Sequence, residues 1–118
     1  MKAILLSAGY GVRLKPLTDN TPKCLLPINE KPLLYHWLDL LENEGVTDVL
    51  INTHYLAEKI EQSIKQRKNA INVVLSYEPN LLGSAGTIFS NKKIFEGEEN
   101  VLLLYSDNLS FILFSKHC

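Results

Sequence analysis

Cysteine is scarce in this sequence of 118 residues: only Cys24 and Cys118 occur, far apart and without Cys-x-x-Cys spacing. Neither a disulfide framework nor a zinc site fits that usage, which predicts a reduced, cytoplasmic protein. Long hydrophobic runs are also missing. The first apolar run, residues 3–6, stops at Ser7 and is too short for a signal peptide or a membrane span. We therefore expect no targeting segment and no membrane partner.

Neither sign of charge is in large excess. Twelve basic and 13 acidic residues give a formal net charge of -1, which argues against binding to nucleic acid or to a membrane surface through bulk charge. The basic residues are unevenly placed, however. Residues 1–31 hold Lys2, Arg13, Lys15, Lys23 and Lys31 against Asp19 and Glu30 alone. This end of the chain suits a small anionic ligand.

The chain has the length of one domain, and internal repeats, low-complexity tracts and interdomain linkers are absent. Short apolar runs alternate with segments of helical period. The runs predict strands at residues 2–7, 48–53, 72–77 and 101–105. The helical segments are residues 32–44, which Pro32 opens and Gly45 stops, residues 57–67, and a short helix after residue 83 with Ser84 as its N-cap. This alternation predicts an α/β fold, a Rossmann-like, mainly parallel sheet with helices on both faces.

A long loop, residues 8–31, follows the first strand, and a loop of that length indicates function. Gly9 and Gly11 allow backbone N–H groups to approach a phosphate. A dinucleotide fingerprint needs a third glycine where Leu14 stands, and a P-loop needs a Gly-Lys-Ser/Thr end that this loop lacks. A third interpretation includes Arg13, whose guanidinium can form bidentate hydrogen bonds to phosphate oxygens. The plain alternative is a tight turn beside a solvated arginine.

A longer pattern decides between these interpretations. Residues 9–18, 21–28 and 31–33 closely resemble the sugar-1-phosphate nucleotidylyltransferase signature G-x-G-x-R-L-x-P-L-T, P-K-x-L-x-P and K-P-L. Residues 54–58 resemble the family's segment after its second strand. Residues 78–86 resemble its E-P-L-G-T-A-G element with two extra residues, and residues 106–108 resemble the G-D element whose aspartate binds magnesium. The resemblance covers residues 2–109 and implies the nucleotide-diphospho-sugar transferase fold.

The resemblance also implies an activity and a site. Members transfer a nucleoside monophosphate from a nucleoside triphosphate to a sugar 1-phosphate and release pyrophosphate, with Mg²⁺ as cofactor. Arg13 and Lys23 would be catalytic and Asp107 would bind the metal. The implied nucleotide-binding residues are Ala8, Gly9, Gly11, Arg13, Lys23, Glu78, Pro79 and Gly83. Plainer alternatives stay open: a surface role for Lys23, a strand end at Glu78 and a helix N-cap at Asp107.

Members of this family are more than twice as long as this chain. We therefore expect residues 1–109 to be the nucleotide-binding half of the domain and residues 110–118 to be a short apolar tail, with weak activity and with association into a homo-oligomer through surface left uncovered. One alternative is a noncatalytic nucleotide-binding module that acts with a partner chain. Another is cytidylyl transfer to an amino-alcohol phosphate, against which residues 82–86 favour a sugar acceptor. A nicotinamide-dependent oxidoreductase is disfavoured by the missing third glycine.

Overall fold

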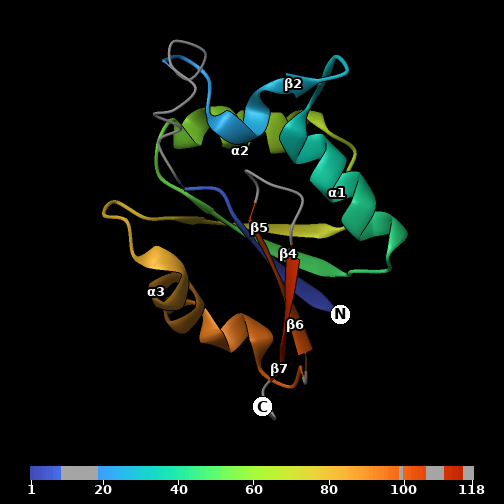
Figure 1. Ribbon diagram of the computed structural model, residues 1–118, viewed down its shortest axis with the longest axis vertical. Coiled ribbons are helices and arrows are strands. Elements are labelled where there is room, and N and C mark those ends of the chain that lie inside the picture. Colours follow the sequence, from blue (N-terminus) through green and yellow to red (C-terminus); the bar gives the residue numbers. More distant parts are fainter. Residues whose placement is uncertain (9–18, 99, 106–110, 116–118) are drawn as a thin grey trace.

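The computed structural model describes residues 1–8, 19–98, 100–105 and 111–115, and it shows a sheet between two layers of helices (Figure 1). The main sheet has five strands in the order β5-β4-β1-β6-β7. Their bounds are Lys2–Leu6 for β1, Asp48–Thr53 for β4, Asn72–Tyr77 for β5, Asn100–Tyr105 for β6 and Phe111–Ser115 for β7. The α/β fold class predicted from the alternation of apolar runs and helical segments is confirmed.

β1 lies at the centre of the sheet and pairs in parallel with β4 on one side and with β6 on the other. β5 continues the parallel sheet beyond β4. Ile4 of β1 is in register with Leu50 of β4 and Leu103 of β6, and all three side chains are buried. Both faces of these strands are covered, which explains why their sequences are continuous apolar runs and do not alternate.

The helices divide between the two faces of the sheet (Figure 1). α1 (Leu33–Asn43) and α2 (Ala57–Gln66) cover one face, and α3 (Gly83–Ser90) with the 3-10 helix η3 (Lys92–Phe95) covers the other. Trp37 and Leu38 of α1 and Ile60 of α2 are at most 1% exposed in the core of the first face. Phe95 belongs to the smaller core of the second. None of the helices in the described ranges is both long and apolar enough to cross a membrane.

α1 begins and ends within one residue of its predicted bounds, 32–44. Pro32 is its N-cap residue, where the missing N–H of proline costs nothing. Gly45 follows the helix with a φ of 79°, the left-handed conformation in which glycine commonly ends helices. α2 differs slightly from its prediction, because it ends at Gln66 and its N-cap residue is Leu56, itself left-handed at a φ of 53°.

The loop expected over residues 8–31 contains regular structure in its second part. A 3-10 helix, η2 (Lys23–Leu25), precedes a small antiparallel hairpin of β2 (Pro27–Ile28) and β3 (Lys31–Pro32). The two residues of its turn, Asn29 and Glu30, have φ values of 52° and 67°. Two positive φ values suit a two-residue hairpin turn, because that twist matches the twist of the strands. The prolines in this region had pointed to a loop alone.

Two other details add to or differ from the expectations. Within the segment expected as a short apolar tail, residues 110–118, Phe111–Ser115 forms β7, which pairs antiparallel with β6 and so satisfies the backbone groups along the outer edge of that strand. Ser84 is not an N-cap residue, because it lies inside α3. Leu82 holds the N-cap position, without a side-chain hydrogen bond. Strong β formers such as those in Phe111–Ser115 take a partner strand where one is available.

Candidate functional site

The carboxyl ends of the parallel strands define the candidate site. The chain leaves β1 toward β4 and later returns to place β6 on the other side of β1, so the strand order reverses between β1 and β6. Open α/β sheets bind ligands outside the carboxyl ends of their strands at such a point. Leu6, the last residue of β1, is in register with Asn52 of β4 and with Tyr105, the last residue of β6. The segments that follow these strands therefore start level with one another.

Several of the predicted site residues lie outside the described residues: Gly9, Gly11, Arg13 and Asp107. In sequence, Asp107 stands two residues after Tyr105. Ala8 is described and only 6% exposed, so its side chain belongs to the fold. Its part in binding a nucleotide stays a prediction, as do the roles of the four residues outside the described ranges.

Lys23 opens η2, and its backbone is held from both sides. The carbonyl of Pro22 accepts a hydrogen bond from the amide of Leu25 at 2.9 Å, and the carbonyl of Lys23 accepts one from the amide of Leu26 at 3.1 Å. Cys24 is 1% exposed, and burial raises the pKa of its thiol to about 12. Lys23 thus belongs to a turn that is anchored in the core, which suits a charge that must be held in place.

The segment that leads into Lys23 is tied to the start of α2. The hydroxyl of Tyr55 donates a hydrogen bond to the carbonyl of Asp19 at 3.0 Å, and the ammonium of Lys59 donates to the carbonyl of Asn20. Tyr55 and Lys59 therefore hold the two residues that come just before the motif at 21–28.

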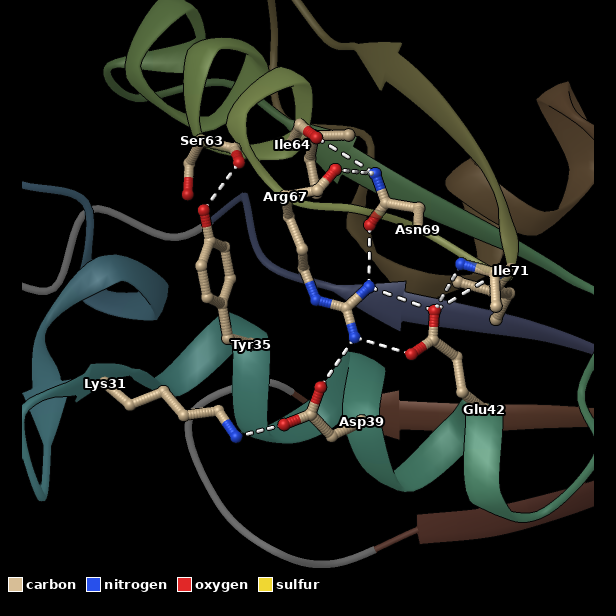
Figure 2. A network of polar contacts seen from close by, with 10 residues as sticks. Lys31, Tyr35, Asp39, Glu42, Ser63, Ile64, Arg67, Asn69 and Ile71 are labelled. Atoms are coloured by element: carbon tan, nitrogen blue, oxygen red, sulfur yellow. Dashed lines mark hydrogen bonds and ion pairs between the residues drawn. The ribbon is translucent and has the colours of Figure 1, made fainter.

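A second set of contacts holds the hairpin and the helices together (Figure 2). Lys31, in the K-P-L element, pairs with Asp39 of α1, and Arg67 bonds both Asp39 and Glu42 of that helix. Arg67 lowers the pKa of the Glu42 carboxyl to about 2, with help from the amides of residues 70 and 71. Lys31 and then Arg67 lower the pKa of Asp39. These ion pairs connect β3, α1 and the segment between α2 and β5.

Glu78 directly follows β5 and is 2% exposed. One carboxylate oxygen accepts a hydrogen bond from the amide of Leu82 at 3.3 Å. The other accepts from the hydroxyl of Thr87 and from the side-chain amide of Asn52, the latter at 3.4 Å. Protein donors therefore surround both oxygens. Contact between Glu78 and a base stays a prediction, and this environment favours the alternative in which Glu78 belongs to the fold.

Pro79 and Gly83 lie on the exposed side of the same turn. Gly83 has a φ of 73°, a conformation that side chains rarely adopt, and it is the first residue of α3. Its carbonyl lies 3.0 Å from the hydroxyl of Thr87. The glycine of the L-G-S-A-G element is thus required by the backbone. Its contact with a nucleotide, like that of Pro79, stays a prediction.

Two residues of this region were missed. Asn52 is 5% exposed and Thr87 is fully buried, and both bond Glu78. Asn52 had a signal in the sequence, because it is a polar residue near the end of a strand that is otherwise apolar. Thr87 had none, since nothing in a short helix tells which of its hydroxyls faces a carboxylate.

No metal cluster is evident among the described residues, where no group of three His, Cys, Asp or Glu side chains lies close enough to hold an ion. Magnesium does not need such a group, because it commonly binds one or two carboxylates together with the phosphates of its substrate. A site that consists of one aspartate and a triphosphate is therefore compatible with the side chains described.

The chain is similar to curated nucleotidyltransferases. Mannose-1-phosphate guanyltransferase beta-B of Xenopus laevis is 36% identical over 110 residues, which are 91% of this chain and 31% of the relative. Choline-phosphate cytidylyltransferase of Streptococcus pneumoniae is 46% identical over 61 residues, 52% of this chain and 27% of the relative. This chain thus spans about a third of the length of these proteins.

Similarity extends to the fold. The crystal structure of HddC from Yersinia pseudotuberculosis complexed with GMP-PN has a TM-score of 0.78 and 30% sequence identity, and the matched part covers 90% of this chain and 47% of HddC. Residues 2–116 match the family described as nucleotidyl transferase. With nearly its whole length in that match, the chain belongs to the nucleotidyl transferase family.

Proposed function

We propose that this chain is the nucleoside-triphosphate-binding part of an enzyme that transfers a nucleoside monophosphate to a sugar 1-phosphate. The observation that carries the proposal is the register of Leu6 with Tyr105 at the point where the strand order reverses. Because of this register, the glycine-rich segment after β1 and the aspartate-bearing segment after β6 begin at neighbouring positions. A polyphosphate bound there would be within reach of both segments.

Arg13 and Lys23 have the chemistry that the reaction needs. An oxygen of the sugar phosphate attacks the α-phosphorus; a new P–O bond forms there while the bond to the β-phosphate oxygen breaks, and pyrophosphate leaves. The attacking oxygen is already an anion at neutral pH, so no strong general base is required. Catalysis then depends on alignment and on neutralising charge, for which cations and backbone N–H groups are suited.

Asp107 would hold Mg²⁺ together with the phosphates of the nucleotide. The ion would neutralise phosphate charge when bound. Because the chain spans about a third of its curated relatives, sugar contacts would come from residues outside this sequence. We expect binding by this chain to be stronger evidence of its function than turnover. The buried thiol of Cys24 is compatible with a reducing compartment such as the cytoplasm.

The acceptor has a second candidate class. The similarity to a choline-phosphate cytidylyltransferase is the higher in identity but covers only 61 residues, whereas the similarity to a mannose-1-phosphate guanyltransferase covers 110. The longer match favours a sugar phosphate, and the shorter one favours an amino-alcohol phosphate. The longer match likewise favours guanine as the base, and the shorter match favours cytosine.

Nucleotide binding is the first test. The melting temperature of the purified chain is measured with GTP, CTP, UTP or ATP, with and without Mg²⁺. A ligand at a hundred times its Kd stabilises the folded state by about 2.7 kcal/mol, which raises the melting temperature by several degrees. We expect one nucleotide to act more strongly than the others and Asp107→Asn to remove the effect of magnesium. The absence of a shift with all four nucleotides would refute the proposal.

Turnover is the second test. Pyrophosphate release is followed with the nucleotide that binds best and with mannose 1-phosphate, glucose 1-phosphate or choline phosphate as acceptor. Release with a sugar phosphate only would select the first acceptor class, and release with choline phosphate only would select the second. Binding without release from any acceptor would support the alternative of a nucleotide-binding module that needs a partner chain.

A further inference from the structure

Few polar side chains are buried in the described part of the chain, and three of them touch one another. Asn52, Glu78 and Thr87 are 5%, 2% and 0% exposed, and they come from β4, from the residue after β5 and from α3. Burial of polar groups is unfavourable unless they are hydrogen-bonded, so a buried group of this kind requires a set of mutually matched donors and acceptors.

Asn52 connects this group to β1. The carbonyl oxygen of its side chain accepts a hydrogen bond from the backbone amide of Ser7 at 2.6 Å, and the hydroxyl of Ser7 donates to the backbone carbonyl of Asn52 at 2.6 Å. Ser7 stands just after the last residue of β1, where the glycine-rich segment starts. Because a backbone amide can only donate, it fixes which end of the Asn52 amide faces it.

The other end of the Asn52 amide therefore points at acceptors. Its NH₂ group lies 3.4 Å from a carboxylate oxygen of Glu78 and 3.4 Å from the hydroxyl of Thr87. Through its second oxygen Glu78 bonds the amide of Leu82, so its carboxylate folds back over the turn that leads to Gly83. Asn52 and Glu78 together thus join the end of β1 to the turn that starts α3.

From these contacts we propose that Asn52 and Glu78 are positioning residues: together they hold Ser7, from which the glycine-rich segment starts, and the turn at 79–83 in one fixed relation, and neither contacts the nucleotide. The inference rests on the proposed function, because those two segments carry the predicted nucleotide-binding residues. It also gives Glu78 a role different from the nucleotide contact that the family resemblance implies.

The amide of Asn52 donates and the carboxylate of Glu78 accepts, so the proposal can be tested by exchanging the donor and the acceptor between these two positions. Asn52→Asp keeps the oxygen that faces Ser7 but replaces the NH₂ group with a second oxygen beside the Glu78 carboxylate. Glu78→Gln alone sets one NH₂ group against another. The double variant Asn52→Asp/Glu78→Gln restores a donor opposite an acceptor with the direction reversed. The hydroxyl of Thr87 can then accept from the new amide and donate to the carbonyl of Gly83, 3.0 Å away.

Asn72→Asp is the matched control. The side chain of Asn72 also donates to a carboxylate, that of Asp48 at 2.9 Å, but it is exposed and lies at the opposite end of β5. The same change of amide to carboxylate therefore takes place next to an acidic residue and far from the carboxyl ends of the strands. A general effect of added negative charge would appear in this variant as well.

The readouts are the Kd for GTP and for CTP, each with magnesium, and the free energy of unfolding of every variant. We expect Asn52→Asp to weaken nucleotide binding by the folded protein about tenfold or more, the double variant to regain most of that loss, and Asn72→Asp to bind within about twofold of the original chain. A purely structural network would lower the stability of the single variants but leave the Kd of their folded fraction unchanged.

Unchanged Kd in folded Asn52→Asp would overturn the positioning role while the proposed function stands. If the original chain binds none of GTP, CTP, UTP and ATP, the proposed function fails and the positioning role fails with it. Should Asn52→Asp not fold, Glu78→Gln and the double variant decide, since we expect Glu78→Gln to bind more weakly than the double variant. Equal affinity of those two would contradict the proposal.

Discussion

Arg67 provides the sharpest test of how this fold is held together. Its side chain is only 8% exposed, and its guanidinium lies 3.0 and 2.6 Å from the two oxygens of Glu42 and 2.6 Å from an oxygen of Asp39 (Figure 2). The paired geometry is the strong form of an arginine–carboxylate contact. Arg67→Met keeps the apolar stem and removes the charge, which leaves Glu42 with backbone donors alone.

The magnitude follows from the pKa of Glu42. Arg67 is the main cause that lowers it from 4.5 to about 2, and the Glu42 side chain is 20% exposed. At about 1.36 kcal/mol per pKa unit, the whole shift corresponds to about 3 kcal/mol of stability. Breaking a buried ion pair by removal of one partner typically costs about 3–5 kcal/mol. The amides of residues 70 and 71 supply part of the shift and remain in the variant, so we expect Arg67→Met to lose about 2–3 kcal/mol at pH 7, measured by urea unfolding.

The pH dependence gives a second measure of the same contact. A carboxyl whose pKa is lowered by folding contributes stability above its unfolded pKa of 4.5 and loses that contribution as the pH falls toward about 2. The gap between the original chain and Arg67→Met should therefore be full at pH 7 and clearly smaller at pH 3. Lys65→Met is the control, because the Lys65–Glu61 pair is 73% and 55% exposed and should be worth at most about 0.5 kcal/mol. A loss below about 1 kcal/mol at pH 7, or a gap that does not change with pH, would refute the argument.

Three further outcomes follow from the site and the core. Lys23→Ala should weaken triphosphate binding about ten- to a hundredfold in a calorimetric titration without unfolding the protein, since it removes one charge-assisted contact; equal affinity would defeat the assignment. Trp37→Ala, at a side chain 1% exposed, should cost about 3–5 kcal/mol, whereas Phe89→Ala, at one 72% exposed, should stay within about 0.5 kcal/mol. In a Cys118→Ser background, Cys24 should not react with a thiol reagent at pH 8 until the chain unfolds, because burial raises its pKa to about 12; rapid labelling of the folded chain would contradict its burial.

Part of the candidate site was readable from spacing. The family was recognised because motifs of charged residues, glycine and proline occur in a fixed order along the chain. The binding roles of Lys23 and Gly83 stay predictions. The fold explains the backbone need for Gly83. Glu78 was recognised as part of a motif. Its hydrogen-bond partners could not be predicted, because they stand 26 and 9 residues away, at Asn52 and Thr87. The roles of Arg13 and Asp107 remain predictions.

By itself the sequence determined where the buried strands and the first helix lie. Asp48–Thr53 and Asn72–Tyr77 match their predicted bounds, because each is a short run rich in apolar residues; the first is buried and the second, at the edge of the sheet, is half-buried in its middle. Only the tertiary structure decided which polar groups meet. The pairing of β6 with β7 and the contacts of Arg67 and Asn52 join segments distant along the chain. Periodicity identifies the buried face of an element, whereas packing selects the residue that it faces.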